Sequence, residues 1–339
     1  MVLQSTWFFL WGLLWAIFFI TDGFDFGVGT LYPFLGKSET DKRTMVAAIG
    51  PLWDGNEVWL LTAGGVTFAA FPTVYAVMFS ALYTPLMLIL FALIIRGVSF
   101  EFRDQIVSPA WTRVWDTTIF IGSFVPALLF GVAFANIFKG IPFNAEGVYE
   151  GNLMTLLNPY GLAGGVLFVL LFTLHGALWL CIRTEGDLQE RTIRTTRILW
   201  PVLLVAAVTF LGASWFATDL YGNYLAQPAL FVIIAVTVAA LVAIRIFIAK
   251  EAWFKAWFAS CTTIFGATFY GIVGLFPNLF PSSLDAALSL TAFNASSSAL
   301  TLKIMLGVVL IFIPLVIAYQ IWAYSIFSHK VSEEDFYVH

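Results

Sequence analysis

Apolar runs long enough to cross a lipid bilayer recur along this chain, and they restrict its fold more than any other feature. A membrane-spanning helix needs about 20 mostly apolar residues. We therefore predict an all-α integral membrane protein with about nine transmembrane helices. The predicted spans are roughly 7–34, 45–70, 73–97, 115–138, 160–182, 197–217, 228–249, 257–280 and 301–327.

The composition supports a membrane protein. Hydrophobic residues make up 60% of the chain and charged residues only 11%, whereas an ordinary soluble domain carries about 25% charged residues. Such a chain has too few charges to cover itself with a surface that faces water. We predict one polytopic membrane domain over residues 1–339, and we expect no nucleic-acid partner.

The second predicted span leaves an alternative open. The stretch GPLWDGNE places polar groups and a Gly-Pro pair inside 45–70. In an eight-span alternative this segment is re-entrant, and its non-helical backbone is then buried in protein or lines a wet cavity.

Basic residues indicate the orientation. With nine spans, alternate connections and the neighbouring helix ends collect fourteen of the sixteen Lys and Arg residues, and the other side holds only Lys139 and Lys303. Lys and Arg are enriched in cytoplasmic loops. This distribution predicts an N-terminus outside, a C-terminus in the cytoplasm and an odd number of spans.

Four acids lie in strongly apolar surroundings near the start of the chain. Asp22 and Asp25 are three residues apart near the end of the first span, and Asp54 and Glu57 have the same spacing in the second. Residues three apart share one helix face. Counted from the predicted helix ends, the acids step from the cytoplasmic edge towards the middle of the membrane, with Asp54 about 14 Å deep.

Acids at this depth suggest a proton relay. An ionised Asp at the centre of a lone membrane helix costs about 2.5–3.5 kcal/mol, and such residues commonly mark ion or proton paths. We favour this function for Asp54, the deeper acid. For Asp22 and Asp25 an equal alternative is a place among lipid head groups. In that alternative they cap turns or pair with basic residues, which are Lys37, Lys42 and Arg43.

Three further residues support this interpretation. Trp53 and Asn56 flank the second pair of acids and are suited to orient waters or carboxylates. Arg96, at the inner end of the third span, either snorkels to the interface or pairs with one of the acids.

Metal and haem ligands are scarce. Cys181 and Cys261 lie far apart and do not resemble a metal cluster. His175 is a lone imidazole in the fifth span, and we expect it to be a hydrogen-bonded core residue. We therefore predict no haem or metal ligand in this chain.

Several long motifs carry a family resemblance. The runs TDGFDFGVGTL, GPLWDGNEVWLLTAGG followed by FAAFPTVYA, WDTTIFIGSFVPALLFGVAFAN and LLNPYGLAGG occur in this order. Together they resemble subunit II of the cytochrome bd-type quinol oxidases. The match covers the first five spans, and from about residue 200 it is mainly one of hydropathy.

The resemblance implies a terminal oxidase in the cytoplasmic membrane of a bacterium or archaeon, which oxidises membrane quinol and reduces dioxygen to water. Subunit I then binds haems b558, b595 and d, while subunit II is a haem-free partner. The implied fold is two four-helix bundles plus one peripheral helix. A structural quinone, known in some relatives, and a small accessory subunit stay open.

The resemblance also assigns a proton path from the cytoplasm to this subunit. Asp54 of the WDGN motif is its best candidate, and the other family acids correspond to Asp22, Asp25 and Asp116. The runner-up function is a proton-coupled secondary transporter, in which the same acids couple substrate movement to protons. Co-purification with a haem-containing partner distinguishes the two.

Overall fold

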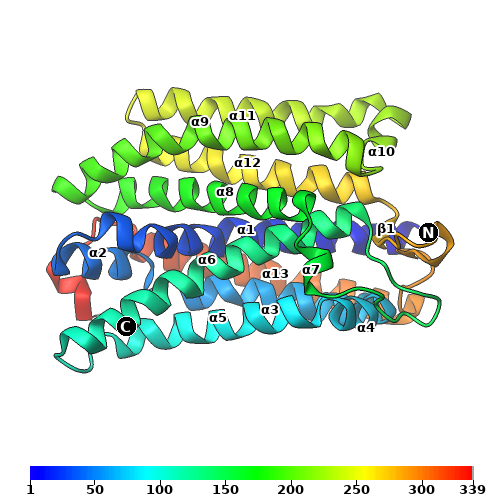
Figure 1. Ribbon diagram of the computed structural model, residues 1–339, viewed down its shortest axis with the longest axis horizontal. Helices are drawn as coiled ribbons and strands as arrows, with labels where there is room; N and C mark the ends of the chain where they lie inside the picture. Colours follow the sequence, from blue (N-terminus) through cyan, green and yellow to red (C-terminus); the bar gives the residue numbers. More distant parts are fainter. Residues whose placement is uncertain (338–339) are drawn as a thin grey trace.

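The computed structural model describes residues 1–337, which are mostly helical (Figure 1). Among these residues, eight helices are long and apolar enough to cross a membrane. They are α1 (Val2–Leu35), α5 (Tyr83–Phe102), α6 (Pro109–Lys139), α8 (Pro159–Arg183), α9 (Gly186–Ala217), α11 (Phe231–Ala249), α12 (Trp253–Leu275) and α13 (Ala299–Ile326). The shorter α-helices are α2 (Glu39–Ile49), α3 (Trp53–Ala70), α4 (Pro72–Ala81), α7 (Leu153–Leu156) and α10 (Tyr221–Ala226).

The remaining regular elements are small. The strands β1 (Asn278–Phe280) and β2 (Leu290–Thr291) pair antiparallel at the end of the molecule that holds the N-terminus (Figure 1). Single 3₁₀ turns are η1 (Pro228–Leu230), η2 (Ala286–Leu288) and η3 (Glu333–Tyr337).

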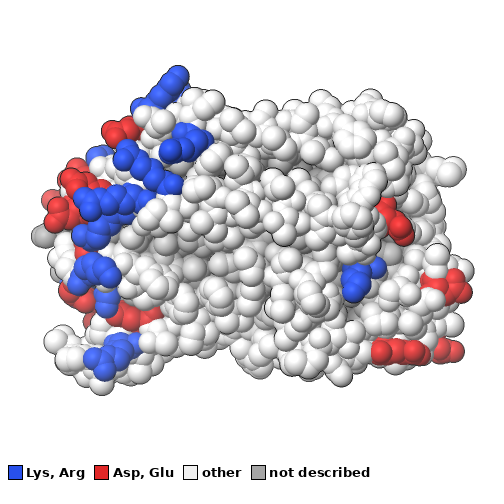
Figure 2. All heavy atoms as spheres, turned by 45° about the horizontal axis from the view of Figure 1, so that its top comes forward, with Lys and Arg blue, Asp and Glu red and all other residues white. Residues whose placement is uncertain are grey.

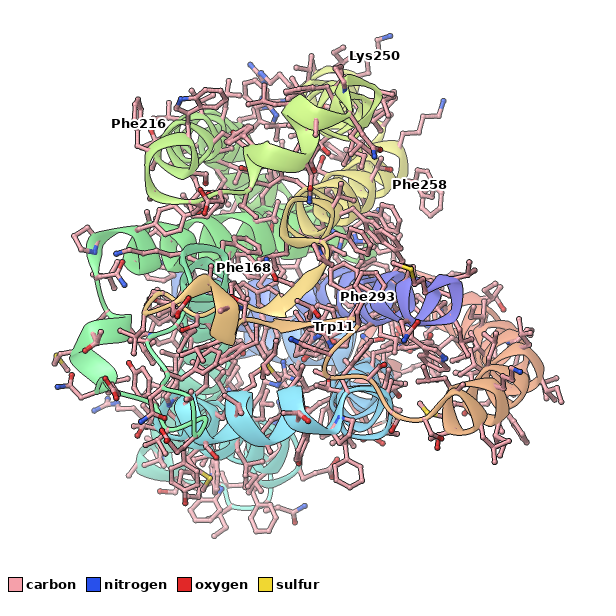
Figure 3. The ribbon with its side chains drawn as sticks, turned by 90° about the vertical axis from the view of Figure 1, so that its right-hand side faces the viewer. Trp11, Phe168, Phe216, Lys250, Phe258 and Phe293 are labelled. Carbon is pink, nitrogen blue, oxygen red and sulfur yellow. The ribbon has the colours of Figure 1, made fainter. Side chains whose placement is uncertain are left out.

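The long helices form two groups, which meet where α8 packs on α1 and α6 (Figure 1). In the first group, α3 and α6 pack on α1, and α5 packs on α6. In the second, α9 and α12 pack on α8, and α11 packs on α9 and α12. Helix α13 makes its main contacts with α1 and α3 and lies at the edge when the molecule is viewed along its helices (Figure 3). The structure is therefore that of an all-α membrane protein, as predicted.

One predicted span is divided. The expected helix at 45–70 is instead α2 and α3, separated by residues 50–52. Pro51 lacks the N–H that a continuous helix needs and disfavours helical backbone in the residue before it. Helix α2 begins with a capping box, in which the Ser38 side chain accepts a hydrogen bond from the Asp41 backbone N–H at 3.0 Å.

Two more predicted boundaries are corrected. The span at 73–97 is α4 and α5, interrupted at Leu82, where Pro85 cannot donate the helical hydrogen bond four residues back. The span at 257–280 stops at Leu275, because Pro277 follows and the chain then enters β1. The other six predicted spans coincide with helices, although α9 begins at Gly186, earlier than expected.

Glycines bring α1 and α8 into close contact. A Cβ added at Gly27 would overlap the backbone of Phe172 and Gly176, and one at Gly176 would overlap the backbone of α1. Small residues allow such approaches in membranes. Around Gly64 and Gly65 of α3, by contrast, the described chain has nothing within 4 Å of a Cβ position.

The surface divides into apolar sides and one basic end. The side chains of Phe216 and Phe258 point away from the bundle, whereas Trp11 lies inside it (Figure 3). Lys and Arg side chains gather at the end that carries α2, and few lie at the opposite end (Figure 2).

Candidate functional site

Two acids of α1 are completely buried. Asp22 and Asp25 are each 0% exposed, thirteen and ten residues before Leu35, the last residue of α1. At 1.5 Å per residue they lie about 20 and 15 Å from that helix end. They are therefore enclosed by protein, well away from the ends of α1.

Arg96 of α5 neutralises part of this charge. Its guanidinium is 0% exposed and places Nη2 2.8 Å from Asp22 Oδ1 and 3.0 Å from Glu57 Oε2. The same group lies 4.4 Å from the centre of the Phe26 ring. The pairing of Arg96 with an acid, one of the two alternatives from the sequence, is confirmed. The alternative in which Asp22 and Asp25 pair with Lys37, Lys42 or Arg43 is wrong.

Asp25 accepts a hydrogen bond from a second group of side chains. The buried Asn56 of α3 donates from Nδ2 to Asp25 Oδ2 at 2.8 Å. Its Oδ1 accepts a hydrogen bond from the Tyr324 hydroxyl of α13 at 2.6 Å. Three helices, α3, α5 and α13, therefore supply the polar side chains that bind the two buried acids of α1 or extend from them. We name as the acid cluster the residues Asp22, Asp25, Asn56, Glu57 and Arg96.

The acid cluster has spare hydrogen-bonding capacity. Asp25 Oδ1 and the Nε and Nη1 atoms of Arg96 are buried and have no hydrogen-bond partner among the described residues. Buried polar atoms in proteins are normally satisfied by protein or by ordered water. Two carboxyl groups, those of Asp22 and Glu57, also share the single Arg96 guanidinium. The cluster is therefore suited to hold water.

Asp54 lies outside this cluster. It is in the first turn of α3 and exposed, one turn before Glu57. Both acids line a groove of about 480 Å³ between α3 and α5, together with Glu101 and mostly apolar side chains. Trp53 lies at the same place, with its ring centre 5.5 Å from that of Phe100.

The expected order of depth is therefore wrong. Asn56 contacts Asp25, and Glu57 contacts the arginine that binds Asp22. Asp54 precedes both on α3, so it is no deeper than the acids of α1. The expectation assumed an unbroken helix from residue 45, but the chain breaks before α3 begins.

Asp116 belongs to a separate network at the basic end. Its carboxylate accepts hydrogen bonds from Tyr32 Oη at 2.8 Å, Lys42 Nζ at 2.6 Å and Arg103 Nε at 2.8 Å. Arg103 also donates two hydrogen bonds to Glu39, and these lower the pKa of the Glu39 carboxyl below its usual value. Tyr32 follows Asp25 by seven residues on α1, about 10 Å along the helix.

The sequence interpretation missed Tyr324 and Gln320. Gln320 Oε1 accepts from Trp59 Nε1 at 3.0 Å, and Gln320 Nε2 donates to the Gly55 carbonyl oxygen at 3.2 Å. Two polar side chains four residues apart share one face of a helix. That spacing in the mostly apolar α13 was a signal for contact with another polar helix.

His175 does not fit as a haem ligand. It is 0% exposed, its Nδ1 lies 2.6 Å from Ser260 Oγ, and its Nε2 lies 3.0 Å from the Ile20 carbonyl oxygen. The Trp257 ring stacks on the imidazole with ring centres 5.4 Å apart. The prediction of a hydrogen-bonded core histidine is confirmed. The described residues also contain no group of His, Cys, Asp and Glu suited to a metal ion.

These features define a multi-pass α-helical membrane protein with charged residues enclosed among its helices. The sequence model of the family described as cytochrome bd terminal oxidase subunit II matches residues 3–327. The chain is 38% identical over 337 residues to cytochrome bd ubiquinol oxidase subunit 2 of Bacillus subtilis (strain 168), covering 98% of each protein. It is 37% identical over 369 residues to cytochrome bd-I ubiquinol oxidase subunit 2 of Escherichia coli (strain K12), covering 98% of this chain and 96% of the relative.

A solved structure supports the fold. A chain from the structure of bd oxidase from Geobacillus thermodenitrificans superposes with a TM-score of 0.78 at 15% identity, covering 96% of this chain and 99% of that chain. The chain belongs to the cytochrome bd terminal oxidase subunit II family. It is part of a quinol oxidase complex, in a family whose haems reside in subunit I. Family membership favours the oxidase subunit over the transporter.

Proposed function

We propose that this chain is the haem-free partner of subunit I and conducts protons from the cytoplasm towards the haems of that subunit. Its acid cluster joins buried carboxyl groups to the partly exposed Glu57, and the exposed Asp54 lies one turn away. The single observation that carries the proposal is this opening of a buried acid cluster onto a groove in the side of the molecule.

The proposed path begins at the basic end. Asp116 and Tyr32 lie there, beside a cytoplasmic pocket of about 490 Å³. Water bound along α1 then links this end to Asp25, and the acid cluster passes protons through Glu57 to Asp54. Bridging water is plausible where buried polar atoms lack protein partners, as at Asp25 Oδ1.

Subunit I is proposed to pack against the face of α3 and α5. Asp54 is exposed there among apolar side chains, and a carboxylate facing lipid at this place is costly. Farther along α3, the open space beside Gly64 and Gly65 suits the close approach of a partner helix. Lipid acyl chains cover the remaining apolar faces, and quinol is oxidised at the level of the complex.

The proposed topology has nine crossings in the cytoplasmic membrane. Helix α3 supplies the ninth, since its 18 residues span about 27 Å, close to the ~30 Å hydrocarbon core. The basic end (Figure 2) faces the cytoplasm under the positive-inside rule. The N-terminus is then outside and the C-terminus inside.

A structural quinone does not fit the apolar cavity of this chain. The cavity lies among α8, α9, α11 and α12, with side chains of α1 and α6 also lining it, and measures about 110 Å³. Pockets that enclose drug-sized ligands measure about 300–1,000 Å³.

Substitution of Asp54 tests the proposal. Asp54→Asn keeps the size of the side chain and removes its titrating proton, so quinol oxidase turnover per haem should fall at least about tenfold with normal haem content. Asp54→Glu should retain part of the activity. The matched control is Asp187→Asn, an exposed acid in the first turn of α9. Wild-type turnover in Asp54→Asn, with haems intact, would exclude Asp54 from the path.

A further inference from the structure

Helix α13 is mostly apolar, and two of its few polar side chains, Gln320 and Tyr324, contact α3 beside the acid cluster. Of its 28 residues, Leu302 alone is buried among those described, so most of the helix has little packing to hold it in place. Three side-chain hydrogen bonds nevertheless join it to α3, and they involve Gln320 and Tyr324. The α3 residues that form these bonds are Gly55, Asn56 and Trp59, which lie within two turns of the helix.

The Tyr324 hydroxyl determines which way the Asn56 amide faces. An amide has an acceptor oxygen on one side and a donor nitrogen on the other. Tyr324 Oη donates to Asn56 Oδ1 at 2.6 Å, and Asn56 Nδ2 donates to Asp25 Oδ2 at 2.8 Å. If the amide turned over, its oxygen would face an Asp25 oxygen, and that contact is favourable only when the carboxyl carries a proton.

The Tyr324 ring is held from several sides. It packs edge-on against Phe24, with ring centres 6.3 Å apart, and against Trp179 at 6.1 Å. Beyond it, the buried Arg183 donates hydrogen bonds to the carbonyl oxygens of Phe327 and His329. This anchors the end of α13 just after the tyrosine, so the hydroxyl is already in place when Asp25 changes its protonation state.

We propose that Tyr324 is a positioning residue for proton transfer, because its hydroxyl holds the Asn56 amide with the donor towards Asp25. The inference rests on the proposed proton path through the acid cluster. Tyr324 acts through Asn56 and does not itself carry the proton. Its contribution is to present Asp25 with a fixed hydrogen-bond donor during each turnover.

Tyr324→Phe in the assembled oxidase complex tests the inference. The variant keeps the ring that packs on Phe24 and Trp179 and removes only the hydroxyl. We expect kcat per haem to fall about three- to tenfold, while the KM for quinol and the haem content stay unchanged. A purely structural role would lower the yield of complex and leave kcat per haem intact. The control is Tyr319→Phe, on an exposed tyrosine of the same helix.

A double-mutant cycle identifies the route of the effect. In an Asn56→Ala background the amide is absent, so Tyr324→Phe should have no further effect on kcat. An equal fall in both backgrounds, or an unchanged kcat in Tyr324→Phe alone, would overturn the inference.

Asp25→Asn separates this inference from the proposed function. If Asp25→Asn turns over at the wild-type rate, the proton path through the acid cluster is wrong and the role of Tyr324 is overturned with it. If Asp25→Asn is slow while Tyr324→Phe is normal, the path stands and only the positioning role is rejected.

Discussion

The arginine of the acid cluster shows how single residues are tolerated inside this membrane protein. Arg96 is fully buried, yet it contacts Asp22, Glu57 and the face of Phe26. Buried ion pairs gain little net stability, because desolvation offsets most of their attraction. Removal of one partner is costly, however, since it leaves the other charge buried and unpaired.

Because removal of one partner is costly while the pair itself gains little, removal of the second partner should restore stability. Asp22→Leu should destabilise the complex by about 3–5 kcal/mol, because Arg96 loses its closest buried partner. The double variant Asp22→Leu, Arg96→Leu should recover most of that loss. Thermal unfolding and the yield of assembled complex measure both effects. If the two substitutions instead lower stability additively, Asp22 and Arg96 do not act as a pair.

At the scale of helices, close packing depends on a few glycines. The contact of α1 with α8 places Gly27 and Gly176 where no side chain fits. Since α1 carries Asp22 and Asp25 and joins the two helix groups, a shift of this contact also disturbs the acid cluster.

Gly27→Ala should therefore destabilise the protein by about 1–3 kcal/mol through overpacking. The matched control is Gly212→Ala in α9, where the described chain has nothing within 4 Å of the added Cβ. Alanine is favoured over glycine in a helix by roughly 0.5–1 kcal/mol, so the control should be neutral or stabilising. Thermal unfolding of both variants gives the comparison, and equal midpoints would rule out a tight contact at Gly27.

Helices were easier to predict from the sequence than the environment of individual acids. Hydropathy located the long helices because a span requires a continuous apolar run. The break before α3 was harder to predict. The depth of Asp54 depends on the residue at which the helix begins again after this break. The partner of Asp25 is Asn56 of α3, 31 residues away, and the tyrosine that contacts Asn56 comes from α13, 268 residues farther along. No local pattern contains such pairings.

For the whole molecule, the uneven charge and the exposed Asp54 of the α3–α5 groove connect topology with the proposed function. The basic end and the opposite end differ clearly in Lys and Arg (Figure 2). Asp116 lies near the basic end, and the groove with Asp54 opens on the side of the molecule. The proposed proton path therefore has a direction, from the cytoplasm sideways into subunit I.

Proton uptake by the oriented complex tests this direction most directly. The oxidase would be reconstituted in vesicles in one known orientation, and a pH indicator would follow each side during dioxygen reduction. We predict that protons disappear from the side of α2, and that Asp54→Asn slows this uptake at least about tenfold while Asp187→Asn does not. Uptake from the opposite side, or uptake at the wild-type rate in Asp54→Asn, would contradict a proton path through this subunit.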